Sequence, residues 1–169
     1  CKAHDLKRTA NEQSLFIVYF YRTNFSKMGL VKTEIELINA SDISFAEAGI
    51  IKEDEIRHTK TIAIVDSGAI MLAINENIKD ALGLKVRSKR SSELADGSIV
   101  SLDLVGPIEV RFGDRFSTTN ALVFPGNQEL LLGAIPMEEM DVLIDPARER
   151  LIPNPEHPNG PQMTLKKTI

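Results

Sequence analysis

The chain has 169 residues, enough for one domain that buries roughly 70% of its unfolded surface. Its formal net charge of −4 and a single basic cluster at 85–90 exclude the basic surface typical of nucleic-acid-binding proteins. One cysteine excludes an intrachain disulfide, and three scattered histidines without ligand spacing predict that the protein binds no metal. We expect no organic cofactor either.

The first part of the chain divides into an extension and the start of a β-rich domain. Residues 1–27 lack sustained periodicity, so we expect them to lie outside a domain that spans residues 28–153. The polar residues at 39–42 predict a turn, and residues 43–59 favour neither a helix nor a strand. Period-two alternation and short apolar runs predict strands at 30–38, 60–65 and 70–74, followed by a helix that Asn75 caps and Gly83 ends.

The second part is richer in hairpin signals. The Asp-Gly pair at 96–97 predicts a hairpin turn, and Gly106-Pro107 is expected to interrupt the strand after it. Pro136 is expected at the first position of a short helix, and the prolines after residue 153 predict an extended, largely unpaired tail at 154–169. Further strands are expected at 84–94, 99–105, 108–112, 116–124, 130–132, 142–145 and 151–152. Eight or nine short strands with one or two short helices indicate an all-β domain, closed or sandwiched.

One stretch, 60–69, combines a buried strand with reactive chemistry at its end. The strand delivers the carboxylate of Asp66 onto a tight turn made by Ser67, Gly68 and Ala69. Ser67 can hydrogen-bond a neighbouring carboxylate or the local backbone, and Gly68 permits a close approach of another chain. An ordinary strand followed by a turn explains the tripeptide equally well, so the remaining chain must distinguish the two interpretations.

Three features occur in the order found in retropepsins: the strand into Asp66-Ser67-Gly68-Ala69, a glycine-tipped hairpin about thirty residues later, and Leu131-Leu132-Gly133 before a short helix. Over 30–158 the sequence resembles the retropepsin-like aspartic proteases, in their bacterial and archaeal branch. The resemblance implies a small closed β-barrel, equivalent to one pepsin-like lobe. It implies that Asp66 is catalytic, that the hairpin tip, made of Ala95, Asp96 and Gly97, is a flap over the substrate, and that Leu131, Leu132 and Gly133 support the acid loop.

The resemblance also implies a homodimer, and the chemistry leads there independently. Peptide hydrolysis of this type uses two carboxylates that share one proton, because both cannot be ionised so close together. Asp96 lies on the hairpin and Asp145 precedes a proline, so neither is a convincing second acid. The second carboxylate is therefore expected from Asp66 of another copy, with the two Ser67 hydroxyls bracing the paired loops.

The prediction is a homodimeric aspartic endopeptidase that cleaves a peptide or protein substrate, with no nucleic-acid or membrane partner and a cytoplasmic location. Two alternatives remain open: a peptide-binding or regulatory module on the same fold, and a purely structural β domain. For Ala95, Asp96 and Gly97 a plain hairpin turn is the alternative to a flap. One departure stands out, because retroviral enzymes have an Arg after the apolar-apolar-Gly that helps tie the dimer together, whereas this chain has Ala134.

Overall fold

The computed structural model describes residues 30–93 and 99–162, apart from the side chains of residues 92 and 93. In chain order the elements are β1 (Lys32–Asn39), α2 (Ala40–Glu47), a 3₁₀ turn η1 (Glu53–Glu55), β2 (His58–Val65), β3 (Leu72–Asn75), α3 (Glu76–Ala81), β4 (Val86–Glu93), β5 (Ile99–Phe112), β6 (Arg115–Phe124), β7 (Leu130–Leu132), α4 (Ala134–Met140), β8 (Val142–Asp145) and β9 (Arg150–Pro153).

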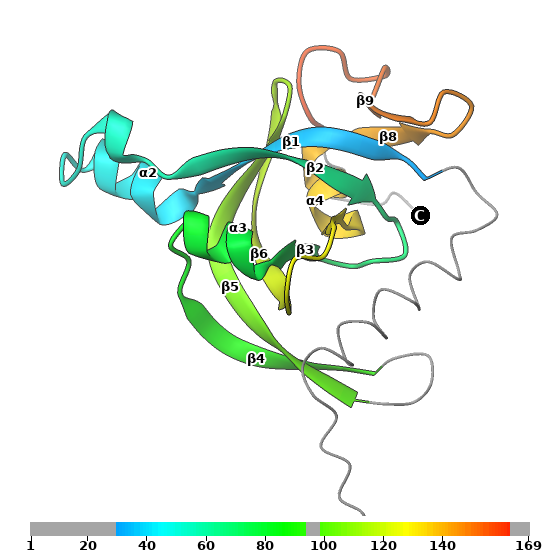
Figure 1. Cartoon of the computed structure of the whole chain (residues 1–169). Helices are drawn as coiled ribbons and strands as arrows, with labels where there is room; N and C mark the ends of the chain where they lie inside the picture. The colour runs from blue at the N-terminus through cyan, green and yellow to red at the C-terminus, as the bar shows by residue number, and fades with distance from the viewer. Residues whose placement is uncertain (1–29, 94–98, 163–169) are drawn as a thin grey trace, which may run out of the picture.

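Six strands close into a barrel. Neighbouring strands pair in the order β1-β2-β7-β3-β6-β5, and pairing between β5 and β1 completes the ring. β4 pairs only with the first half of β5 and extends from the ring as one arm of a hairpin (Figure 1). The expectation of a small closed β-barrel is confirmed.

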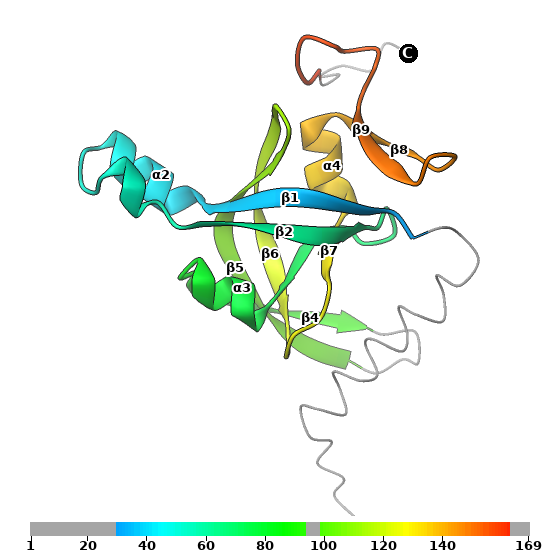
Figure 2. The ribbon, with the colours of Figure 1, turned by 45° about the horizontal axis from the view of Figure 1, so that its top comes forward.

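The barrel encloses one large apolar core. Alternate residues of each strand point inward, as the period-two pattern predicts, and among the most deeply buried are Ile35, Leu37, Leu72, Ile74, Ile108 and Leu132. β7 is buried along its whole length because it lies between two strands: it pairs in parallel with β2 and antiparallel with β3. Figure 2 shows β7 within the barrel wall, next to β2.

Three local expectations differ from the structure. Helix α2 occupies the stretch expected as a turn, because the side chain of Asn39 accepts hydrogen bonds from the amides of Ser41 and Asp42 and so starts a helix. β5 continues through Gly106-Pro107, with a register shift against β6 between Val105 and Ile108, as the strand changes its partner from β4 to β1. Helix α4 begins at Ala134, two residues before the proline that was expected to open it.

The other short helix follows its prediction. α3 begins after Asn75, whose side chain accepts a hydrogen bond from the Ile78 amide over 3.0 Å. Gly83 follows the helix with a φ of +58°, a conformation that glycine adopts without strain. In the described parts of the chain, no helix is long and apolar enough to cross a membrane.

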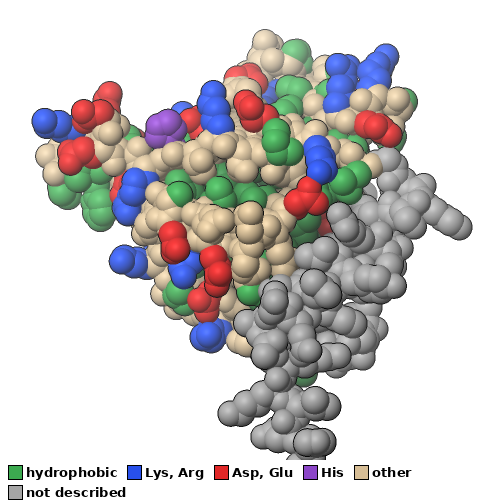
Figure 3. Space-filling view, viewed as in Figure 1, with side chains coloured by type: hydrophobic (Ala, Val, Ile, Leu, Met, Phe, Trp, Pro, Cys, Tyr) green, Lys and Arg blue, Asp and Glu red, His purple; other side chains and the backbone are tan. Residues whose placement is uncertain are grey.

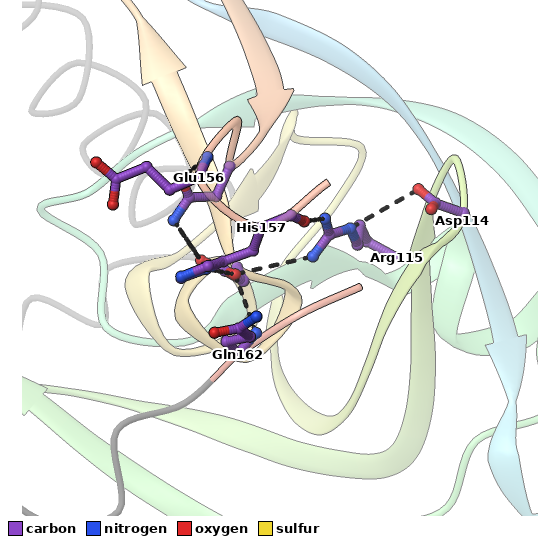
Figure 4. A network of polar contacts seen from close by, with 7 residues as sticks. Asp114, Arg115, Glu156, His157 and Gln162 are labelled. Atoms are coloured by element: carbon purple, nitrogen blue, oxygen red, sulfur yellow. Dashed lines mark hydrogen bonds and ion pairs between the residues drawn. The ribbon is translucent and has the colours of Figure 1, made fainter. Parts of the chain in front are cut away.

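The C-terminal segment is bonded to the barrel, so the prediction of a largely unpaired tail is wrong for residues 154–162. Asp141, which ends α4 in the left-handed conformation, accepts hydrogen bonds from the Asn154 side chain over 2.8 Å and from the Gln162 amide over 3.0 Å. His157 bonds the same carboxylate, and its carbonyl accepts a bond from the buried Arg115 over 2.5 Å (Figure 4). The hydrogen bonds from Asn154, Gln162 and His157 lower the pKa of Asp141 to about 2.

Candidate active site

Asp66 lies where strand β2 ends inside the barrel wall. The residue is 3% exposed, and its amide donates to the carbonyl of Leu132 over 3.0 Å, which continues the parallel pairing of β2 with β7. The backbone of the acidic residue is therefore fixed by the neighbouring strand, and the chain turns immediately after it.

The acid loop, residues 66–71, is held by bonds within itself. The Gly68 amide donates to Oδ1 of Asp66 over 2.8 Å, and the Ala69 amide donates to the Asp66 carbonyl over 3.2 Å. The first bond fixes the rotation of the carboxylate as well as its position. Ser67 and Gly68 are exposed, and Ala69 is half-buried, so the tip of the loop faces outward from the barrel.

A second segment, 133–135, lies directly against this loop. The amides of Ala134 and Ile135 donate to the carbonyls of Ala69 and Ile70, over 2.8 and 3.0 Å. A Cβ on Gly133 would lie 2.3 Å from the carbonyl oxygen of Met71 and 2.8 Å from that of Ala69. Only a glycine lets the two backbones approach so closely, which gives a steric reason for glycine after Leu131 and Leu132.

A second apolar cluster lies on the face of the strands that points away from the barrel core. Its buried members are Ala73, Val100, Leu102, Phe124 and Leu131, and half-buried Ala69 and Ile64 pack against it. Because Val100 and Leu102 belong to β5, one arm of the β4–β5 hairpin contributes to the same apolar cluster that the acid-loop residue Ala69 packs against. The expected flap residues Ala95, Asp96 and Gly97 lie outside the described residues.

The structure thus brings Asp66, Ala69, Leu131, Leu132 and Gly133 together. Asp66 forms no salt bridge within the described chain, although Arg and Lys side chains pair with other carboxylates. Sequence reasoning missed two exposed isoleucines: Ile70, within the loop, is 70% exposed, and Ile135, beside the loop, is 41% exposed. An apolar residue next to a buried strand gives no sign in the sequence that its side chain is exposed. Only the fold could therefore show that these two isoleucines are exposed.

Comparison with known proteins points the same way as the geometry. The sequence model of a family described as aspartyl protease matches residues 54–134, from η1 through β7 to the first residue of α4. No curated protein matches the chain. The matched segment contains the acid loop, the β4–β5 hairpin and the glycine that abuts the loop. Over residues 54–134 the chain is similar to the aspartyl protease family, and this match supports the retropepsin-like resemblance of the sequence.

Proposed function

We propose that the protein is a homodimeric aspartic endopeptidase in which each copy contributes Asp66. The observation that carries this proposal is a buried, hydrogen-bonded carboxylate held by a rigid loop and left without a cation in the described chain. A carboxylate next to an Arg or Lys stays ionised, whereas one without such a partner can share a proton with a second acid.

The second acid is best supplied by another copy of the chain. In the described residues the other Asp side chain as deeply buried is Asp42, which Arg57 binds with both oxygens engaged. Asp141 and Asp145 are also occupied, by the tail segment and by Arg148. A two-fold axis beside the acid loop would place two identical carboxylates within a few ångströms of each other.

In the proposed reaction the pair carries one proton. The protonated carboxyl donates a hydrogen bond to the carbonyl of the scissile peptide bond, and the ionised carboxylate takes a proton from the attacking water. The exposed Ser67 hydroxyl of each copy is free to brace the opposite loop, and the β4–β5 hairpin covers the peptide through Ala95, Asp96 and Gly97.

The experiment that tests the proposal is peptide cleavage by purified protein, read by mass spectrometry at stepped pH between about 4 and 7. We expect cleavage that a transition-state analogue of the pepstatin type inhibits and that Asp66→Asn abolishes. Circular dichroism of the variant should match that of the unaltered chain. Peptide binding without cleavage would instead identify a binding module, and cleavage by Asp66→Asn would exclude the proposed mechanism.

A further inference from the structure

Residues 154–162, which we call the C-terminal strap, are bonded to the residue that follows helix α4. That residue is Asp141, and its carbonyl accepts a hydrogen bond from the Asn154 amide over 2.9 Å. Its carboxylate accepts from the Asn154 side chain over 2.8 Å and from the Gln162 amide over 3.0 Å, and the His157 ring bonds it as well (Figure 4). One carboxylate thus holds the beginning, the middle and the end of the strap.

A buried cation joins the strap to the barrel. Arg115, the first residue of β6, is 1% exposed, and its Nη2 donates to the His157 carbonyl over 2.5 Å. Its Nη1 lies 3.8 Å from Oδ2 of Asp141, and its Nε lies 3.8 Å from a carboxylate oxygen of Asp114. Within the described residues Nε and Nη1 have no hydrogen-bond partner. Because a buried charge is unfavourable unless it is bonded, loss of the strap would leave this guanidinium without its bond to the His157 carbonyl.

The other end of α4 contacts the acid loop. The amides of Ala134 and Ile135, the first two residues of the helix, donate to carbonyls of the loop. The helix has seven residues and is therefore about 10 Å long, and Met137 and Met140 pack it against the barrel core. A short hydrogen-bonded helix is a rigid element that can couple the groups at its two ends. A displacement at Asp141 is therefore transmitted to the acid loop.

We propose that Asp141 is a positioning residue for Asp66: held by the C-terminal strap, it fixes the far end of α4, and α4 in turn fixes the acid loop. The catalytic part of this inference rests on the proposed function, because a reacting carboxylate must be held in a narrow range of positions. The route runs from the strap to Asp141, along α4, and through the Ala134 amide to the loop. Asp141 acts on Asp66 through the helix and contacts no substrate.

The chain offers a matched control at the other end of the next strand. Asp145 ends β8, which begins directly after Asp141, so the two residues are about 13 Å apart along the strand. Their side chains are 12% and 11% exposed, and Asp145 is also paired, with Arg148 and Arg150 of its own hairpin. Figure 3 shows acidic and basic side chains on the outer end of the β8–β9 hairpin, at the upper right. Asp145→Asn thus removes a carboxylate of equal burial away from α4.

Asp141→Asn breaks the clamp with little strain. Asparagine tolerates the left-handed backbone at this position, where φ is +52°. Both carboxylate oxygens of Asp141 accept hydrogen bonds, Oδ1 from Asn154 and Oδ2 from Gln162. An amide group in either orientation therefore sets a donor against a donor of the strap.

Hydrogen–deuterium exchange of the full chain, read by mass spectrometry, measures the coupling without relying on activity. The amides of Ala134 and Ile135 are bonded to the loop, so their exchange reports the opening of that contact. We expect Asp141→Asn to speed exchange in peptides covering 66–71 and 133–136 at least about fivefold, and Asp145→Asn to leave it within about twofold.

Steady-state kinetics of peptide cleavage test the catalytic consequence. We expect Asp141→Asn to lower kcat at least about tenfold per folded molecule and to leave KM within about threefold, because the helix holds the acid loop and not the substrate. His157→Ala should lower kcat as well. His157→Asn, whose side-chain amide can replace the ring nitrogen as a donor, should restore most of it. Asp145→Asn should leave kcat within about twofold.

Each adverse result has its own meaning. Unchanged exchange at the acid loop in Asp141→Asn would overturn the inference, and so would an equal rise in Asp145→Asn, which would indicate general destabilisation. An unchanged kcat with faster exchange, or a rise in KM alone, would show that Asp141 does not position Asp66. If the unaltered chain cleaves no peptide while Asp141→Asn selectively loosens the loop, the proposed function fails and the coupling of the strap to the loop is supported.

Discussion

Two equally buried carboxylates, those of Asp42 and Asp66, lie near opposite ends of strand β2 and have different hydrogen-bond partners. Asp42 and Asp66 are each 3% exposed. Arg57, the residue before β2, donates to Asp42 through its amide and through two guanidinium nitrogens at 2.7 Å. Asp66, the residue after β2, accepts one hydrogen bond on its carboxylate within the described chain, from the Gly68 amide.

The difference separates a carboxylate that stabilises the fold from one suited to chemistry. The bonds from Arg57 lower the pKa of Asp42, so this group stays ionised and joins the α2 lobe, residues 40–57, to the start of β2. The Asp66 carboxylate accepts its bond in the described chain from a backbone amide, and it lies at the base of a loop whose tip is exposed. The comparison makes Asp42 the control for Asp66 in the activity experiment.

The largest effect is expected on activity. Asp66→Asn should lower the rate of peptide cleavage by at least about 1,000-fold, because general acid–base catalysis by the pair is lost. Asp42→Asn, which removes an equally buried charge, should keep the rate per folded molecule within about threefold, as expected for a site remote from the chemistry. Equal losses of cleavage rate in the two variants would show that Asp66 has no catalytic role that Asp42 lacks.

Gly133→Ala tests the steric support of the acid loop. The added Cβ would lie 2.3 Å from the Met71 carbonyl oxygen, so one of the two backbones must shift. We expect a loss of about 1–3 kcal/mol in the free energy of unfolding, together with a severe loss of activity in the protein that still folds. Gly113→Ala is a control, since a Cβ there meets nothing within 4 Å, although its φ of +60° adds a small strain of its own. Unaltered cleavage by Gly133→Ala would argue against this support.

Asp42→Asn tests the structural site. The variant leaves Arg57 without its carboxylate, but the Arg57 side chain is 48% exposed and water can replace part of the interaction. We therefore expect a loss of about 1–2 kcal/mol in the free energy of unfolding, measured by urea denaturation. Most surface substitutions change the free energy of unfolding by less than about 0.5 kcal/mol. A loss that small in Asp42→Asn would mean that the paired carboxylate does not hold the α2 lobe.

Acid titration sharpens the same comparison. The folded pKa of Asp42 is lowered by Arg57, and that of Asp141 is lowered to about 2 by Asn154, Gln162 and His157. Both groups therefore stabilise the folded state above the unfolded Asp pKa of about 3.9, and this contribution is lost as the pH falls from about 4 toward 2. Urea denaturation at stepped pH should show a shallower fall in Asp42→Asn than in the unaltered chain. If the free energy of unfolding fell equally steeply with pH in both proteins, the Asp42–Arg57 pair would not contribute to stability in this range.

Local patterns predicted much of this architecture. The alternation from Val31 to Leu37 indicated which side of β1 enters the core, and Asn75 and Gly83 marked the ends of α3. Each of these signals depends on residues a few positions apart. The start of α2 was misread for the opposite reason, since Asn39 serves equally well in a turn and at a helix N-terminus.

The candidate site was predictable in its chemistry and less so in its surroundings. Asp66 and Gly133 could be selected because their motifs are short and ordered along the chain. The exposure of Ile70 and Ile135 could not be predicted, since it depends on which face the barrel leaves uncovered. The bonded tail was also missed, because proline-rich composition indicates only that regular elements are absent, and Asp141 and Arg115 lie far from the tail in sequence.

By itself the sequence determined an acidic residue at the end of a buried strand, a β-rich domain around it and a chain with one such acid. These properties follow from periodicity and turn chemistry, which act between neighbouring residues. Only the tertiary structure decided that β7 lies beside β2 and that Gly133 touches the loop. It also decided that, among the described residues, Asp42 has a cation beside it and Asp66 has none. Contacts between residues distant in sequence depend on closure of the barrel, which no local pattern encodes.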